Sequence, residues 1–145
     1  MKLKRPRKFR PADSAQQVVG GFLLAGPFVV TEEVWLLAEN MSVLQAIATV
    51  GVVFGIGYAT LYKADTKRDP ATEQVIVGIP VRFISLMVVS FGSVAILATL
   101  FDAPDTFLEH AETNAEIVLT TFKAISVGSV FSVVGAATAD SVFSR

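Results

Sequence analysis

The sequence predicts an all-α, polytopic membrane protein with four transmembrane helices, and three observations support this fold class. Apolar residues make up 52% of the 145 residues, and the mean hydropathy of +0.59 exceeds that of ordinary soluble domains. The chain contains four apolar segments, and a helix of about 20 residues spans roughly 30 Å of hydrocarbon. Short polar connections separate them. The expected helices cover residues 15–38, 43–63, 75–101 and 116–139, with a basic arm over 1–13, a transmembrane domain over 14–145 and an outer acidic loop over 102–116.

The basic arm sets the expected orientation of the chain. Lys and Arg number six in the arm, three in residues 63–73 and one at Arg145, against none in the connections 39–42 and 102–116. Loops rich in Lys and Arg stay on the cytoplasmic side, so both termini are expected in the cytoplasm of a multi-pass cell-membrane protein. Contact with anionic lipid is a second role for the arm, and no nucleic-acid partner is expected. The cations concerned are Lys2, Lys4, Arg5, Arg7, Lys8 and Arg10.

The first apolar segment carries two carboxylates that an ordinary membrane anchor would avoid. Glu32 and Glu33 lie near its outer end, and a carboxylate at the centre of a bilayer costs about 2.5 to 3.5 kcal/mol. At about 100° per residue, Glu33 and Trp35 lie on opposite sides of a continuous helix. If Trp35 faces lipid at the outer interface, Glu33 therefore faces the interior of the bundle. Glu32 then lies on the flank and can reach water.

Lys123 in the fourth apolar segment is the expected partner of Glu33, because both lie about five or six residues from the outer end of their helices. Pro27 cannot donate to the carbonyl of Leu23, and a free carbonyl near a carboxylate is a feature of cation sites. Two interpretations make use of this pair: a charge pair that only stabilises the bundle, and a site for a solute or a proton. Unpaired side chains that reach the interface are a third. The predicted intramembrane polar site comprises Glu33, Lys123, Glu32, Thr31 and Pro27.

Rows of small residues predict close helix packing. Gly51, Gly55 and Ala59 recur every four residues in the second segment, and Gly128 and Ser132 form a similar row in the fourth. Such rows let helix backbones approach closely. We expect a homo-oligomer, although packing within one subunit is the alternative use of these rows.

Charged side chains at the inner ends of the helices form a second candidate site. Arg82 lies one or two turns inside the third segment. It either extends to the inner interface or pairs with Asp140 or Asp65. In the acidic loop, His110 stands among carboxylates and is expected to be solvated, so no metal site is predicted.

An internal repeat would make the protein two tandem helical hairpins. Gln17, Val18 and Gly21 match Gln74, Val75 and Gly78 at a constant offset, and residues 51–54 resemble residues 128–131. Transporters are often built by such duplication. The two halves are then expected to superpose by rotation about the membrane normal.

The first segment also resembles a known family. Gly20, Gly21, Pro27 and the block Thr31-Glu32-Glu33-Val34-Trp35 are similar to the Gly-Gly, Pro, Thr-x-Glu-x-Trp first helix of an uncharacterised prokaryotic family of integral membrane proteins. The resemblance implies a multi-helix membrane fold and singles out Glu33. Glu32 and Val34 depart from the family pattern, which has Met at both positions.

Three function classes follow from these patterns. A small oligomeric channel or transporter for an ion or proton leads, and a non-transporting scaffold or accessory subunit is the alternative. An enzyme is not expected, since the sequence has no Cys, a single His and no spacing typical of a nucleophile and its base, and no cofactor is expected. A water-filled path at Glu33 would favour transport, whereas a dry bundle with an exposed contact face would favour a scaffold.

Overall fold

A computed structural model describes residues 8–64 and 68–143, which are almost entirely helical. Three helices are long and apolar enough to cross a membrane, and a bent pair of helices forms a fourth crossing if the two are counted together. This confirms the all-helical class, and three to four helical segments are candidate membrane spans by their length and composition. The helices are α1 (Pro11–Val29), α2 (Glu32–Asn40), α3 (Val43–Ala59), α4 (Val81–Leu100), α5 (Ala103–Phe107) and α6 (Asn114–Phe143), with a π-helical turn at Thr60–Ala64 and a 3-10 turn at Pro70–Thr72.

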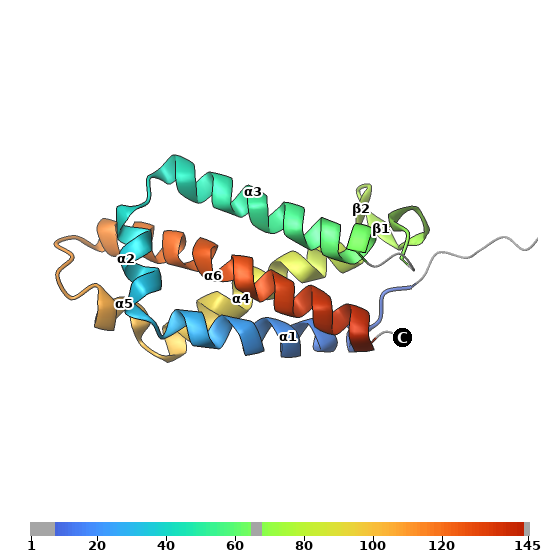
Figure 1. Cartoon of the computed structure of the whole chain (residues 1–145), viewed down its shortest axis with the longest axis horizontal. Coiled ribbons are helices and arrows are strands. Elements are labelled where there is room, and N and C mark those ends of the chain that lie inside the picture. The colour runs from blue at the N-terminus through green and yellow to red at the C-terminus, as the bar shows by residue number, and fades with distance from the viewer. Residues whose placement is uncertain (1–7, 65–67, 144–145) are drawn as a thin grey trace, which may run out of the picture.

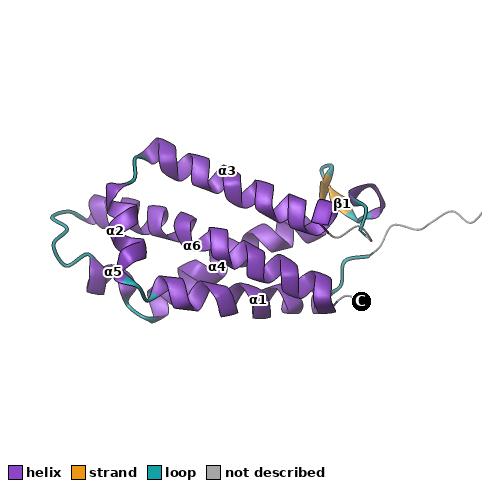
Figure 2. Ribbon diagram, in the orientation of Figure 1, coloured by secondary structure: helices purple, strands orange, loops and turns teal. Residues whose placement is uncertain are grey.

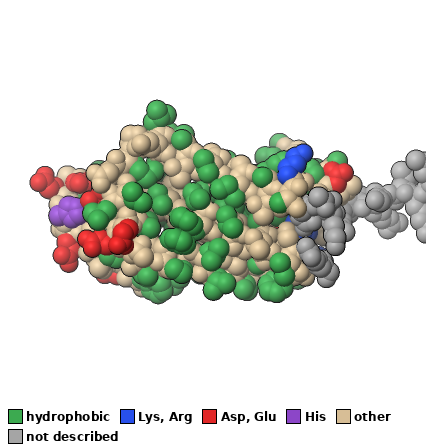
Figure 3. Space-filling model, in the orientation of Figure 1, with side chains coloured by type: hydrophobic (Ala, Val, Ile, Leu, Met, Phe, Trp, Pro, Cys, Tyr) green, Lys and Arg blue, Asp and Glu red, His purple; other side chains and the backbone are tan. Residues whose placement is uncertain are grey.

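The bundle core consists of α1, α4 and α6, which all pack against one another, while α3 lies along α6 on one side (Figure 1). At one end α2 and α5 cover the bundle, and most of the surface carboxylates visible in Figure 3 gather there. We call this the acidic end. The start of α1 and the end of α6 lie together at the opposite end, where Gln16 donates to the carbonyl of Phe143. We call this the terminal end.

The first apolar segment is not one helix, which corrects the expected helix over 15–38. α1 begins four residues earlier than expected, at Pro11, and α2 departs from α1 at 80°. Pro27 lies in the last turn of α1, and Thr31 is the N-cap of α2, with Glu32 and Glu33 in the first turn. Carboxylates at that position favour a helix start because they complement the positive end of the helix dipole. The break therefore has local causes in the sequence.

Trp35 closes this break from the inside. Its indole nitrogen donates to the carbonyl of Val29 at 3.0 Å, and the hydroxyl of Thr31 donates to the carbonyl of Phe28 at 3.0 Å. Two of the last carbonyls of α1, which have no partner within the helix, are therefore hydrogen-bonded. Trp35 is 2% exposed. The condition under which Glu33 was placed in the bundle interior, a Trp35 side chain that faces lipid on one continuous helix, is therefore not met.

The third apolar segment also differs from its expected helix over 75–101. Residues Val75–Ile76 (β1) and Ile79–Pro80 (β2) pair as a small antiparallel hairpin, shown in Figure 2, before α4 begins at Val81. Val77 and Gly78 both have positive φ, as the type I′ two-residue hairpin turn requires. In contrast, the matched residues 17–21 are helical. The two stretches of the proposed repeat thus have different structures, and tandem hairpins stay a prediction.

Glycines bring α1 and α6 into backbone contact. A Cβ added at Gly20 would collide with the carbonyl oxygen of Gly135, and a Cβ added at Gly135 would collide with the carbonyl oxygen of Gly20. On α6, Gly128 also packs against Val94 of α4. The small-residue row of the fourth segment is therefore used inside the subunit. The row on α3 is not, since Gly51 and Gly55 have no atom near the position of a Cβ.

Candidate functional site

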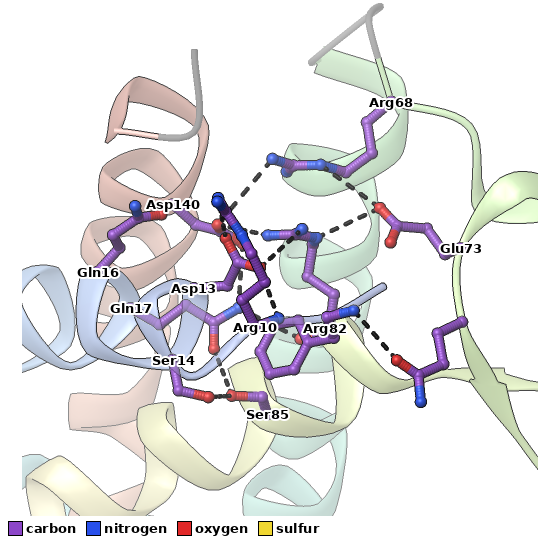
Figure 4. Close-up of polar contacts among 12 residues, drawn as sticks. Arg10, Asp13, Ser14, Gln16, Gln17, Arg68, Glu73, Arg82, Ser85 and Asp140 are labelled. Atoms are coloured by element: carbon purple, nitrogen blue, oxygen red, sulfur yellow. Dashed lines mark hydrogen bonds and ion pairs between the residues drawn. The ribbon is translucent and has the colours of Figure 1, made fainter. Parts of the chain in front are cut away.

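Five buried charged side chains meet at the terminal end of the bundle. They come from three helices and from the connection before β1, and each is at most 5% exposed. We call them, together with the buried amide of Gln17, the charge cluster (Figure 4). The charged members are Asp13 of α1, Arg68 and Glu73 of the connection, Arg82 of α4 and Asp140 of α6.

Arg82 is the centre of the charge cluster. Its guanidinium contacts Asp140 at 2.6 Å, Glu73 at 3.2 Å and Asp13 at 3.4 Å. The planar guanidinium presents donors in fixed directions, so a single Arg can join several carboxylates from different elements. Its carbon Cζ also lies 5.3 Å from the ring centre of Phe9. Arg82 therefore joins α1, α4, α6 and the connection before β1.

The remaining polar groups complete the cluster. Gln17 donates to Asp140 at 3.0 Å and accepts from Ser85 at 2.7 Å, and Ser85 shares a hydrogen bond with Ser14. Arg68 lies 3.6 Å from Glu73 and 4.0 Å from Asp140. The backbone N–H and the guanidinium of Arg10 both contact Asp13.

A row of buried hydroxyls continues from the charge cluster into the bundle. Ser93 of α4 and Ser132 of α6 share a hydrogen bond of 2.8 Å, and Ser132 contacts the carbonyl of Gly21 at 3.1 Å. Further buried serines on α4 and α6 donate to carbonyls of their own helices; these are Ser90, Ser126 and Ser129. We call this row the polar seam. Hydroxyls of this kind commonly hold membrane helices together.

Toward the acidic end the interior becomes apolar and dry. A slot between Val29, Trp35, Val94, Ala98 and Ala124 has no room for a water molecule. On the far side of Trp35 lies a cavity of about 230 Å³ that is open to the acidic end. Trp35 lines both spaces. The cavity is also lined by Glu32, Leu36, Glu39, Thr106, Phe107, Glu109 and His110.

The predicted pair of Glu33 and Lys123 is not found. Both Glu32 and Glu33 are exposed, because the bend turns α2 out of the bundle. Lys123 is 8% exposed and donates to the carbonyl of Met41 at 2.6 Å, after α2. The prediction failed because it placed Glu33 on a straight continuation of α1. Pro27 is itself exposed in the last turn of α1, and the hydroxyl of Thr31 bonds within the break.

At the terminal end the structure brings Arg82 and Asp140 together, as one of the two open interpretations had it. Asp65 lies outside the described residues, as do Lys2, Lys4, Arg5 and Arg7 of the arm. Lys8 and Arg10 are exposed. At the acidic end, His110 is paired with Glu39 at 2.8 Å on the surface, and among the described residues no group of three His, Cys, Asp or Glu side chains is placed to hold a metal ion.

Sequence reasoning missed four members of the site, namely Asp13, Gln17, Arg68 and Glu73. Asp13 could have been found from the sequence, since Pro11 followed by Asp13 is typical of a helix start. The first helix would then have been predicted to begin inside the segment assigned to the basic arm. Glu73 has no such signal, because its burial depends on how the connection folds over the bundle. No family model, curated protein or solved structure matches this chain, so the family resemblance of the first segment stays a prediction.

Proposed function

We propose that this chain is a membrane protein that passes a proton or a small monovalent cation along the polar interior of α1, α4 and α6. The terminal end then lies in the cytoplasm, as the count of Lys and Arg in the loops predicts. The observation that carries the proposal is the charge cluster, which continues through the polar seam to the level of Ser93 and Ser132.

The cost of the charge cluster supports a functional interpretation. Each buried ion loses several kcal/mol of hydration, so a buried ionic cluster is weak evidence for a purely stabilising role. Ionisable groups inside membrane segments often mark ion or proton paths, and Arg82 and Asp140 lie within two of the candidate spans. Three helices share this cluster, so a rearrangement of Arg82 would change the packing of all of them together.

The acidic end supplies the other half of the proposed path. Carboxylates around the cavity attract cations from solution, since a cleft lined by one sign of charge concentrates the opposite ion. Trp35 lines both this cavity and the dry slot, and in this proposal its side chain is the barrier between the cavity and the polar seam. The conformation described is a closed one, with the path blocked at Trp35 and at the charge cluster.

An increase in ion flux tests this proposal better than a loss, because a misfolded variant would lose flux but would not gain a flux that is selective for protons or monovalent cations. Trp35→Ala should raise the flux of protons or monovalent cations into proteoliposomes severalfold, while Trp35→Phe, which keeps most of the bulk, should stay near wild type. Leu37→Ala is the matched control, since Leu37 is exposed on the same helix. Adding Asp140→Asn to Trp35→Ala should lower the flux again.

Circular dichroism and a dye-release assay on the same vesicles establish that each variant is folded and that the bilayer is intact. The transport proposal fails if wild type and folded Trp35→Ala both give the flux of empty liposomes for protons, Na⁺ and K⁺. It also fails if Leu37→Ala raises the flux as much as Trp35→Ala does.

A second function, a non-transporting subunit that assembles through α3, has one observation of its own. Only 17% of the most apolar stretch of this helix is buried, against 44% in α6, and Gly51 and Gly55 face outward with open space above them. Gly55→Leu should then lower the oligomeric mass in nanodiscs. Gly92→Leu is the matched control, because Gly92 on α4 also has open space. Equal masses for wild type, Gly55→Leu and Gly92→Leu would rule out this surface.

A further inference from the structure

The hairpin of β1 and β2 at the terminal end exposes a group of apolar side chains (Figure 2). Val77 at its tip is 94% exposed, and Val75, Ile76 and Ile79 are each about half exposed. Pro80, where the hairpin joins α4, is buried. Apolar side chains that are exposed side by side mark contact with another protein or with a membrane. We call residues 75–80 the terminal hairpin.

The residue at the tip of the terminal hairpin is unfavourable for the turn that it occupies. Val77, with a φ of 52°, is the first central residue of a type I′ turn, and Gly78 is the second. Asn, Asp and Gly are preferred at these positions, whereas a β-branched residue at positive φ is an outlier. Neither the turn nor packing inside the subunit therefore accounts for Val77. An apolar environment outside the subunit would favour it.

The level of the terminal hairpin along the bundle indicates what that environment is. α4 begins at Val81, directly after β2, and its 20 residues span about 30 Å, the thickness of the hydrocarbon core. The hairpin that precedes α4 is therefore expected where the hydrocarbon core meets the lipid headgroups. Tyr58 of α3 packs edge-on against Phe83 in the first turn of α4 and is 38% exposed. Exposed Tyr is typical of this boundary.

Exposed cations lie at the base of the terminal hairpin. The backbone N–H of Phe9 donates to the side chain of Gln74, the residue before β1, at 3.1 Å. Lys8 and Arg10, on either side of Phe9, are both exposed. Cations beside an apolar tip suit a membrane surface that contains anionic lipids, because headgroups meet the cations and acyl chains receive the tip. A second copy of this chain would bring identical cations to the contact, where like charges repel.

We propose that the tip of the terminal hairpin inserts into the lipid boundary of the membrane that the helices cross, with anionic headgroups at Lys8 and Arg10. The tip stops at the boundary, because the outer edges of a two-stranded hairpin keep unpaired backbone groups that need water. The same connection carries Glu73, which contacts Arg82, so the inserted hairpin would hold one side of the charge cluster in place. This proposal does not rest on transport and needs only that the helices span a membrane.

Spin-label accessibility in nanodiscs tests this placement, since both membrane faces are open to solution there. The chain has no Cys, so Val77→Cys gives a single site for a nitroxide label. Oxygen, which concentrates in lipid, and a neutral nickel chelate, which stays in water, report the surroundings of the label. In nanodiscs of phosphatidylcholine and phosphatidylglycerol, the label at residue 77 should collide with oxygen and should collide with nickel severalfold less than a label in water.

Two further single-cysteine variants calibrate the measurement. Glu112→Cys places the label on an exposed residue of the acidic end, where nickel collisions should dominate. Val52→Cys places it on α3, within a candidate span and 51% exposed, where oxygen collisions should dominate. Adding Ile76→Ser and Ile79→Ser to Val77→Cys should raise nickel collisions severalfold, because both changes lie on the surface of the hairpin and remove its apolar contacts. Circular dichroism establishes that each variant is folded.

Nickel collisions at residue 77 equal to those at residue 112 would overturn the proposal. So would a label at residue 77 that neither oxygen nor nickel reaches, because this result would assign the tip to a contact between protein chains. Collisions that stay the same after both serine substitutions would show that the label alone holds the tip in lipid, which also overturns it.

The composition of the nanodisc tests the role of the cations separately. Without phosphatidylglycerol, nickel collisions at residue 77 should rise, because the headgroups no longer attract Lys8 and Arg10. Unchanged collisions would overturn the part given to these two residues. None of these outcomes decides whether wild type or Trp35→Ala passes ions, so this proposal and the transport proposal fail separately.

Discussion

The backbone contact between Gly20 and Gly135 makes a sharp prediction about stability. An ordinary Cβ contact lies at 3.4–4 Å, whereas a Cβ at Gly20 would overlap the carbonyl oxygen of Gly135 and lie 2.7 Å from the Cβ of Ala139. To relieve this overlap, α1 and α6 must separate by on the order of 1 Å, and a gap of that size forfeits a quarter to a half of each dispersion contact along the crossing.

The expected loss of stability depends on which atoms can move to make room for the added Cβ. Overpacking usually costs about 1 to 3 kcal/mol because flexible side chains adjust. Here the obstructing atoms belong to the backbone of a helix, so we expect Gly20→Ala to destabilise the protein by about 3 kcal/mol. By contrast, Gly55→Ala on α3 meets no atom within 4 Å and should be neutral or stabilising by up to about 1 kcal/mol, since Ala favours helix more than Gly.

The assay is reversible unfolding in mixed micelles of detergent and sodium dodecyl sulfate, followed by circular dichroism. Gly20→Ala and Gly135→Ala should each lower the free energy of unfolding. The double variant should lose less than the sum, because the first substitution already separates the helices. If Gly20→Ala lies within about 0.5 kcal/mol of Gly55→Ala, the reasoning is refuted and the two helices do not touch at these glycines.

Three further changes have defined outcomes. Arg82→Lys should destabilise by about 2 to 4 kcal/mol in the same assay although it keeps the charge, because an ammonium cannot reach three carboxylates at once; equal stability would contradict the central role of Arg82. Lys123→Met should cost about 1 to 2 kcal/mol through loss of the bond to the Met41 carbonyl and should speed hydrogen exchange in α2; unchanged exchange would argue against this bond. A hydrogen bond and like charge from Asp105 raise the pKa of Asp102 above its ordinary 3.8, so stability from the protonated pair is lost as pH rises through that raised pKa. Asp102→Asn should therefore unfold at a higher temperature than wild type at pH 7 but not at pH 3, and a constant difference would contradict the assignment.

The fold class could be predicted from composition and segment length, because both depend only on local hydropathy. The contacts of the charged side chains were harder to predict, since they depend on where a helix bends and how a connection folds. The pairing of Arg82 with Asp140 was one of two open alternatives, and no pattern in the sequence decides between a side chain that reaches water and one that finds a partner. Glu73 could not be predicted at all, because its contact with Arg82, nine positions later in the chain, depends on how the connection and the hairpin fold over the bundle.

Glu33 avoids the cost of burial by lying outside the bundle, and not by pairing with Lys123 inside it. Two carboxylates make a straight first helix expensive to insert, and for this reason a buried partner is predicted for one of them. The protein has another solution. The 19 residues of α1 already span about 28 Å, close to the thickness of the hydrocarbon core. A bend of 80° after Val29 then carries Glu32 and Glu33 out of the bundle and leaves Trp35 to fill the space behind them. The same desolvation cost that argued for an ion pair is avoided by ending the crossing early, and the Thr31-Glu32-Glu33 helix start is the local signal for it.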